Sequence, residues 1–417
     1  MDSLRVNGER LWRSLMDLAR IGATPKGGVK RLALTDIDRE GRDRFVAWAR
    51  ESGLETRVDA IGNIFAVRNG TQAGAPPVVM GSHLDSQPSG GKFDGAYGVL
   101  AGLEVVRTLN DAGVRTRAPL EVAAWTNEEG SRFTPTMMGS GVFIGAHPLE
   151  QVLAHKDLDG VSVQEALQRI GYAGTASTHE VGAYFEAHIE QGPVLEATKT
   201  TIGVVQGALG QRWFDVVVTG QDAHAGPTPM ETRQDALVAA SRLVVEVNRI
   251  ATTFPDYARG TVGQMQVKPN SRNVVPGEVR MSTEFRSASD ATLSSMVEEY
   301  RRVAKTIAAA CRVSIEIREV VYFPPSHFAP ELVAAVRDAA SGLGLSHCDI
   351  VSGAGHDAVY LSRVAPTAMI FVPCEGGISH NEIESATQED LAAGCNVLLH
   401  AVLARAGVAS PQKEVSP

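Results

Sequence analysis

The segment GSHLDSQPSGGKFDG, residues 81–95, places one histidine and two aspartates among glycines and serines. His83 and Asp85 stand two positions apart at the expected end of a strand, so both side chains would point to the same side. The glycines that follow let the backbone fold back, which brings Asp94 toward the same point. An imidazole combined with carboxylates suits zinc, manganese or cobalt better than calcium, which prefers oxygen ligands alone. The segment is therefore a candidate metal site, and a polar surface loop is its alternative.

Other chemistries fit the sequence less well. The stretch SGGKF resembles part of a phosphate-binding loop, but Ser86 occupies the place of the first glycine and Phe93 that of the magnesium-binding hydroxyl. No GxSxG motif of a serine hydrolase occurs. The four cysteines are scattered without a CxxC pair, which indicates reduced thiols in a cytoplasmic protein.

Two adjacent carboxylates follow an apolar run in TNEEG. Neighbouring residues of an extended chain point in different directions, so Glu128 and Glu129 are expected to have different roles. One can bind a metal while the other acts as general base on a water whose pKa the metal lowers. Taken alone, the pair is more simply explained as two solvated acids near a helix N-terminus.

Two more histidines stand where predicted strands end. His188 lies in FEAHIEQG and His380 lies in the glycine-rich GGISHNE. Each alone is more simply a histidine of the core or of a surface turn. Together with the acids at the ends of other predicted strands, they favour a site for two metal ions.

The length and composition are those of a soluble globular protein of two domains. The chain has 417 residues, which is more than a single hydrophobic core usually holds. Of these residues 44% are hydrophobic and 21% charged, which is ordinary for a globular protein. Its formal net charge of −9 argues against a nucleic-acid partner. The N-terminus is charged and no apolar run approaches 18 residues, so we expect neither a signal peptide nor a membrane span.

The predicted elements would gather these side chains at one edge of a sheet. Strands at 77–85 and 118–130 alternate with a helix at 98–113, which predicts an α/β fold with a mostly parallel central sheet. Ligands bind such sheets at the carboxyl ends of the strands. The same alternation of helices and strands returns near the C-terminus, with a helix at 330–343, a strand at 366–373 and a helix at 388–406.

Between these parts the pattern changes to that of an inserted α+β domain with an antiparallel sheet. Helices at 231–251 and 290–311 alternate with strand-like runs at 260–268, 278–287 and 312–322. We predict a catalytic domain from 1–210 and 328–417 and an inserted domain at 211–327. The tail ASPQKEVSP is expected to be disordered.

The inserted domain carries three polar side chains of interest. His224 in DAHAG could donate a hydrogen bond to an oxyanion. Asn273 and Arg286, expected on neighbouring strands, could together hold a substrate carboxylate. Plain polarity of a sheet surface explains Asn273 and Arg286 equally well.

The motifs occur in an order that resembles the hydantoinase/carbamoylase family of amidases, within a metallopeptidase clan of aminopeptidase-like fold. The similarity runs from about residue 8 to about residue 406. Members of this family include N-carbamoyl-L-amino acid hydrolases, β-ureidopropionases and allantoate amidohydrolases. The resemblance rests on GSHLDSQPSGGKFDG, TNEEGSRF, HIEQGP, DAHAGPTPM, SRNVVPGEV, GAGHDA and GISHNE.

The resemblance implies two divalent metal ions in each subunit, most often zinc and in some members manganese, cobalt or nickel. By motif, Asp94 would bridge the ions, His83 and His188 would complete one, and Glu129 and His380 the other. Glu128 becomes the general base and Asp85 a partner that orients His83. The histidine at 188 favours the carbamoylase branch over the aminoacylases.

The resemblance also makes the inserted domain a lid and the contact of a homodimer. His224 would then reach a neighbouring subunit's site, and the residues that bind a small ureido acid would be Asn273, Arg286, Gln191 and Arg212. The implied reaction is hydrolysis of an N-carbamoyl amino acid to amino acid, ammonia and carbon dioxide. Alternatives are an allantoate amidohydrolase, an N-acyl amino acid deacylase or peptidase, and a non-catalytic metal-binding protein.

Overall fold

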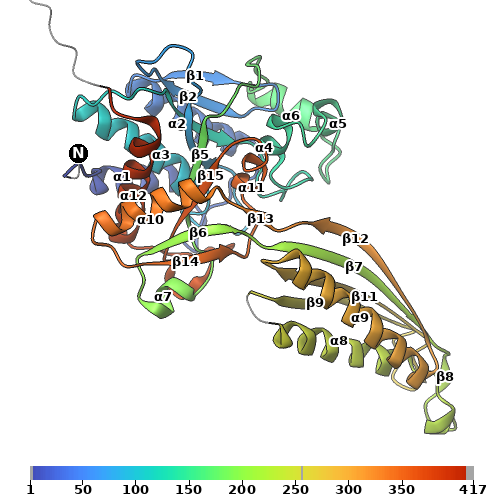
Figure 1. Cartoon of the computed structure of the whole chain (residues 1–417). Coiled ribbons are helices and arrows are strands. Elements are labelled where there is room, and N and C mark those ends of the chain that lie inside the picture. Colours follow the sequence, from blue (N-terminus) through green and yellow to red (C-terminus); the bar gives the residue numbers. More distant parts are fainter. Residues whose placement is uncertain (1–2, 255–256, 410–417) are drawn as a thin grey trace, which may run out of the picture. The chain divides into compact units, whose positions relative to one another are not determined.

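The computed structural model describes residues 3–254 and 257–409. The chain divides into two compact units, which are described separately (Figure 1). The larger unit takes the chain up to Gln206 and again from His327, and the smaller unit is Gly207–Ser326.

The larger unit is built on a nine-stranded sheet in the order β1-β2-β4-β3-β5-β15-β6-β13, with β14 paired to β6. At its centre β4, β3, β5 and β15 are parallel, whereas β1, β2 and β6 join antiparallel. The predicted mostly parallel central sheet is thus confirmed. The strands are β1 (Glu55–Val58), β2 (Ile64–Arg68), β3 (Val78–His83), β4 (Leu120–Trp125), β5 (Ala183–Ile189), β6 (Ile202–Ala208), β13 (Ser326–His327), β14 (His347–Ser352) and β15 (Thr367–Val372).

The four central strands are buried along their whole length. They are near-continuous apolar runs, as expected for parallel strands with helices on both faces. Strand β4 ends at Trp125, earlier than the predicted 130, because Asn127 adopts a left-handed conformation with φ 53°. The chain therefore turns before it reaches the two glutamates.

Helices cover both faces of this sheet. On one face α1 (Gly8–Ala19), α3 (Ala96–Asp111), α10 (Pro330–Gly342) and α12 (Gln388–Ala406) pack together. On the other face α4 (Met138–Phe143) and α11 (Asp357–Leu361) contact each other and the central strands (Figure 1). The remaining helices are α2 (Asp36–Glu51), α5 (Leu149–Leu153), α6 (Val163–Ile170), α7 (Val194–Thr198) and the 3₁₀ helix η2 (Glu375–Gly377).

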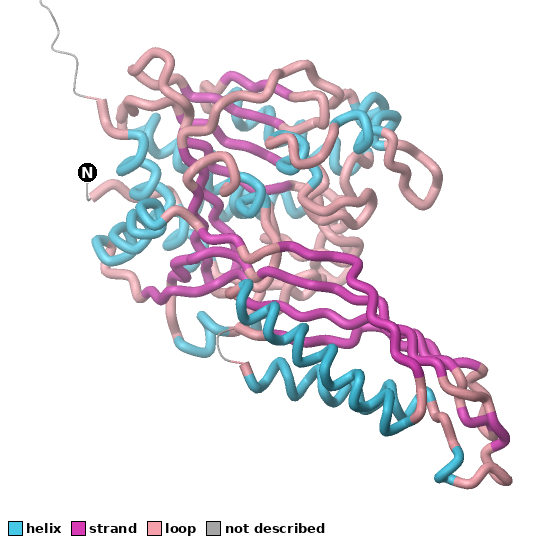
Figure 2. Tube along the Cα trace, turned by 45° about the vertical axis from the view of Figure 1, so that its right-hand side comes forward, coloured by secondary structure: helices cyan, strands magenta, loops and turns pink. Residues whose placement is uncertain are grey.

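The smaller unit has four antiparallel strands in the order β12-β7-β11-β9, and its two long helices lie along one face of them (Figure 2). These strands alternate between the covered and the open face, so the predicted antiparallel sheet is confirmed. A short ribbon of β8 and β10 completes the unit. Its elements are β7 (Gly210–Thr219), β8 (Ala223–His224), η1 (Met230–Thr232), α8 (Ala236–Thr253), β9 (Arg259–Lys268), β10 (Val274–Val275), β11 (Glu278–Ser287), α9 (Asp290–Cys311) and β12 (Ser314–Phe323).

Helix α8 begins five residues later than the predicted 231. The Asp235 side chain accepts hydrogen bonds from the N–H groups of Leu237 and Val238, which caps the helix at that point. In neither unit does a described helix combine the length and the apolar character needed to cross a membrane. The predicted disordered tail falls almost wholly outside the described residues.

Candidate metal centre

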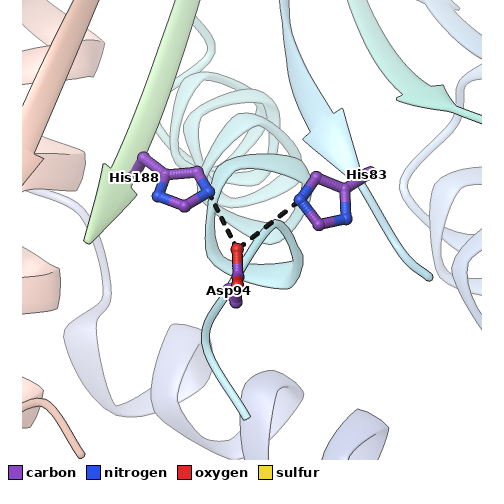
Figure 3. A group of neighbouring side chains, drawn as sticks. All are labelled: His83, Asp94 and His188. Atoms are coloured by element: carbon purple, nitrogen blue, oxygen red, sulfur yellow. Dashed lines mark ion pairs between the residues drawn. The ribbon is translucent and has the colours of Figure 1, made fainter. Parts of the chain in front are cut away.

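Asp94 lies between two groups of side chains that could each hold a metal ion. Its Oδ1 is 3.2 Å from Nε2 of His188 and 3.6 Å from Nε2 of His83 (Figure 3). Its Oδ2 is 3.3 Å from Nε2 of His380, which is also 3.3 Å from Oε2 of Glu129. The donor atoms of each group lie within 4.8 Å of one another. The two oxygens of one carboxylate therefore face two different groups.

The parallel sheet explains why residues so distant in sequence meet. His83 is the last residue of β3, and His188 is the second-last of its neighbour β5, so both lie at the carboxyl edge. Asp94 lies two positions before the first residue of α3, and Gly95, with φ 65°, is the residue between them. A Cβ at Gly95 would lie 2.4 Å from the ring of His83, so only glycine allows this close approach.

Backbone carbonyls orient both buried imidazoles. Nδ1 of His83 donates to the carbonyl oxygen of Asp85 at 2.9 Å, and Nδ1 of His188 donates to that of Ile189 at 2.9 Å. A carbonyl oxygen can only accept, so each Nδ1 carries a proton and each Nε2 is directed at Asp94. This is the arrangement usual for histidines that bind metal through Nε2.

Asp85 contacts the ring of His83 through its backbone carbonyl and not through its carboxylate. Its carboxylate Oδ1 is 3.9 Å from Nδ1 of His83, beyond hydrogen-bond distance, and the backbone carbonyl orients the ring instead. The carboxylate accepts from the backbone N–H of Glu128 at 3.2 Å and of Glu129 at 3.3 Å. Asp85 therefore orders the turn that carries the two glutamates.

Glu128 and Glu129 occupy different positions in the centre. Glu129 belongs to the group with His380, and Gln87 donates to it through its backbone N–H and its side-chain amide. Glu128 belongs to neither group, and its Oε2 lies 3.5 Å from Nε2 of His83. A carboxylate beside the donor groups, and not among them, is free to exchange protons.

Burial and neighbouring charges shift the pKa values of these acids. Burial raises the pKa of Glu128 well above its usual range, and the nearby carboxylate of Asp357 adds to the rise. Burial and the charge of Asp94 raise the pKa of Glu129 to about 7. Burial also opposes ionisation of Asp94, but hydrogen bonds from His188 and the other two histidines outweigh it and hold its pKa well below the usual range.

The donor set fits a pair of divalent cations. The ion pairs of Asp94 within the described residues are all with histidines, and the chain places two glutamates beside it. With neutral imidazoles, several buried carboxylates would remain without a countercharge, which is costly unless a cation is bound. Mixed nitrogen and oxygen donors suit zinc, manganese, cobalt or nickel.

A third group of possible ligands overlaps the first. Glu186 and His356 lie near His188, and all three are buried. The oxygens of Glu186 already accept from the hydroxyls of Ser82 and Tyr184 and from the N–H of Ala358. Glu186 is thus held within the protein, which makes this group a poor site for a further ion.

Sequence reasoning missed two residues that contact the centre. Gln87 lies inside the first motif, four positions after His83, and its amide was not considered. Glu384 follows His380 by four residues and accepts from the N–H of Asp94 at 3.2 Å. Their closeness to motif residues was the available signal. Gln191, which was predicted, donates to Oδ2 of Asp94 at 3.0 Å.

Asn273 and Arg286 were expected on neighbouring strands, but the structure places them at opposite ends of β11. His224 of β8 pairs with Val274, next to Asn273, beyond the end of β11 where Glu278 pairs with Thr219. Arg286 pairs with Gln211 near the opposite end of β11. The eight steps along the strand from residue 278 to residue 286 span about 26 Å at 3.3 Å per residue. Within one chain, Asn273 and Arg286 cannot grip the same carboxylate.

Arg212 is engaged within the smaller unit. Its Nε donates to Oε1 of Glu319 at 3.2 Å, and its second terminal nitrogen pairs with the other oxygen. Its guanidinium also lies over the ring of Tyr322. These contacts account for Arg212 without a substrate.

Comparisons with known proteins agree with the motifs. The model of peptidase family M20/M25/M40 matches residues 79–404. An N-carbamoyl-L-amino-acid amidohydrolase of Rhizobium meliloti is 49% identical and the match covers 98% of each chain. One from Geobacillus stearothermophilus is 38% identical over 95% of this chain and 98% of the relative. A solved hydantoinase/carbamoylase family amidase of Burkholderia multivorans is 57% identical, covers 97% of this chain and 99% of its own, and has a TM-score of 0.94.

Matches of this extent, on a chain that brings the motif histidines and acids together around Asp94, identify the family. The chain belongs to peptidase family M20/M25/M40 and, within it, to the hydantoinase/carbamoylase amidases.

Proposed function

We propose that this chain is a metal-dependent amidohydrolase that cleaves the carbamoyl C–N bond of N-carbamoyl amino acids, with N-carbamoyl-L-amino acids as the first candidates and N-carbamoyl-β-alanine as the second. The observation that carries the proposal is that the two oxygens of the Asp94 carboxylate face two different donor groups, with Glu128 beside His83 of the first group. The names of the relatives support the substrate class.

The residues that would hold the two ions follow from the two groups. His83 and His188 would bind one ion, Glu129 and His380 the other, and Asp94 both. We propose zinc as the metal, with manganese, cobalt or nickel as alternatives. When bound, the ions supply Lewis acidity that makes water more acidic and polarises the ureido carbonyl.

Glu128 acts as general base in this proposal. It takes a proton from the attacking water as the water oxygen bonds to the carbamoyl carbon, and it returns that proton to the leaving nitrogen as the C–N bond breaks. Cleavage of this C–N bond leaves a carbamic acid, which breaks down in water by losing its remaining nitrogen. Overall, one water and one carbamoyl amino acid give the amino acid, ammonia and carbon dioxide. The raised pKa of Glu128 suits a group that must hold a proton between two steps.

Substrate binding requires a second copy of the chain. Arg286 would hold the substrate carboxylate, and His224 and Asn273 would come from the partner subunit because they lie at the other end of β11. His224 would donate to the developing oxyanion. Gln191, which contacts Asp94, would face the substrate, and the smaller unit would form the homodimer contact. Arg212 would have to leave its ion pair with Glu319 to contact substrate.

The test is ammonia release from a panel of N-carbamoyl-L-amino acids, N-carbamoyl-β-alanine, allantoate and an N-acetyl amino acid, the last followed by acetate release. The protein is assayed as purified, after chelation, and after zinc or manganese is restored. Release from carbamoyl amino acids that chelation abolishes and metal restores is the expected result. Activity on allantoate or on the N-acetyl compound alone would replace the substrate assignment, and inactivity with two bound ions would refute the reaction.

A further inference from the structure

We propose that Glu384 is a positioning residue that ties the Asp94 segment to the His380 segment and thereby sets the affinity for the ion bound by Glu129 and His380. The inference rests on the metal centre of the proposed function. It concerns a side chain that contacts neither ion nor substrate in that proposal.

The first arm of this tie reaches the segment before α3. Glu384 is 1% exposed, and its Oε1 accepts from the backbone N–H of Phe93 at 2.9 Å and of Asp94 at 3.2 Å. Two N–H groups on one carboxylate oxygen fix the backbone at the residue that faces both groups. Hydrogen bonds to a charged acceptor are the stronger kind.

The second arm reaches the residue next to His380. Oε2 of Glu384 accepts from the hydroxyl of Ser379 at 2.8 Å. That hydroxyl oxygen also lies 3.3 Å from Oδ2 of Asp94, and the side-chain amide of Gln191 donates to it at 3.1 Å. One carboxylate therefore connects two segments that lie about 290 residues apart in sequence.

The space around Glu384 is closely filled. A Cβ at Gly91 would lie 2.0 Å from its carboxylate, so the chain passes directly against this side chain. A glycine is needed there for that close approach. The carboxylate is thus held from three sides in one position.

The His380 segment needs such a tie more than the strand-borne ligands do. The side chain of His380 is 52% exposed, and its backbone is left-handed with φ 53°. His83 and His188 are anchored by a buried sheet, whereas His380 sits in a turn. Loss of the tie should therefore affect the Glu129–His380 ion first.

Two variants separate positioning from charge. Glu384→Ala removes both arms. Glu384→Gln keeps a carbonyl oxygen for the two N–H groups and an amide that can donate to Ser379, while it removes the charge. Zinc binding to the full-length protein is measured by competition with a chromophoric chelator, and cobalt(II) absorption reports the ligand geometry. The alanine variant should raise the Kd of the ion held by Glu129 and His380 at least tenfold. The Kd of the glutamine variant should stay within threefold of that of the natural protein.

The matched control is Glu104→Ala. Glu104 is also buried and accepts from the backbone N–H of Asn7 and the side chain of Arg10. It lies nine residues after Gly95 on α3, about 14 Å along the helix axis. Its loss should lower stability and leave both zinc affinities within threefold.

The outcomes are distinguishable. The inference is overturned by Glu384→Ala with an unchanged Kd, by an equal loss in Glu104→Ala, or by a glutamine variant as weak as the alanine variant. If Glu384→Ala does not fold, Ser379→Ala cuts the second arm, and an unchanged Kd there overturns the inference. A natural protein that binds no zinc would instead refute the proposed metal centre itself.

Discussion

Gln87 contacts both oxygens of Glu129. Its backbone N–H donates to Oε1 at 3.1 Å, and its side-chain amide donates to Oε2 at 2.7 Å. Oε2 is also the oxygen that lies 3.3 Å from Nε2 of His380. A residue of the first motif thus orients a carboxylate of the second.

Replacing Gln87 by leucine should weaken the Glu129–His380 site. The side chain keeps its approximate size, and the backbone hydrogen bond remains, so only the amide contact is lost. Loss of such supporting contacts typically lowers metal affinity about 10- to 100-fold. Zinc competition measures the change. Ser131→Ala is the control. Ser131 donates to the amide oxygen of Gln87, which does not contact Glu129, so this substitution should have little effect on zinc binding. Unchanged zinc binding in Gln87→Leu would contradict this role.

The adjacent glutamates should fail in different ways when each becomes glutamine. Glu128→Gln should lower kcat by about 10²- to 10⁴-fold while both ions stay bound, because Glu128 belongs to neither ligand group. Glu129→Gln should lose one ion, because Glu129 is among the donors. Metal content and kcat are measured on the same preparations. Loss of metal in Glu128→Gln, or full metal content in Glu129→Gln, would reverse the two assignments.

The sequence was sufficient for the sheet and for the cluster of motif residues. Apolar runs that end in polar residues predicted the strand ends near His83 and His380, and the rule that parallel strands bind ligands at their carboxyl edge predicted that those residues meet. It could not show that β3 and β5 are neighbours, because about 100 residues separate them and pairing depends on the tertiary fold.

The contacts of Glu384 and Asp85 that support the metal centre could not be predicted from the sequence either, because they also depend on the tertiary fold. Glu384 and Asp85 act on backbone N–H groups, which every residue but proline possesses, so no side-chain pattern marks the partner. The separation of Asn273 from Arg286 depends on the length and register of β11, which pattern alone leaves open.

Mixed dimers should reveal a site shared between two chains. Arg286→Ala and His224→Ala chains should each be nearly inactive alone. In a mixed dimer, one site combines the natural Arg286 of one chain with the natural His224 of the partner subunit, and the other site carries both changes. Random mixing makes half of the dimers mixed with one good site in two, so about a quarter of the natural activity should return.

The measurement is activity after the two variants are co-unfolded and refolded, or co-expressed with different tags and purified through both. The chain that carries both substitutions, mixed with either single variant, is the control and should restore nothing. If His224 served the site of its own chain, the Arg286→Ala and His224→Ala mixture would remain inactive. That result would refute the shared site and leave the metal centre untouched.

The stability of the protein should fall as the pH rises through 6, in part because of Asp59. Asp59 is 5% exposed, and burial raises its pKa to about 6 although the N–H groups of Ile61 and Asn63 donate to it. In the unfolded chain its pKa is about 3.8. Folding therefore favours the protonated acid, so this contribution to stability is complete below pH 3.8 and is lost as the pH passes 6.

The rise of the Asp59 pKa from 3.8 to about 6 corresponds to about 3 kcal/mol of unfolding free energy, of which about 2 kcal/mol is lost between pH 4.5 and 7. Urea unfolding of the natural protein and of Asp59→Asn over this pH range isolates the contribution of Asp59 to the unfolding free energy. The asparagine keeps a carbonyl acceptor for the two N–H groups and has no charge to bury. The difference in unfolding free energy between the two proteins should move by about 2 kcal/mol in favour of Asp59→Asn as the pH rises. A difference that stays constant over the range would show that Asp59 ionises in the folded protein as easily as in the unfolded chain.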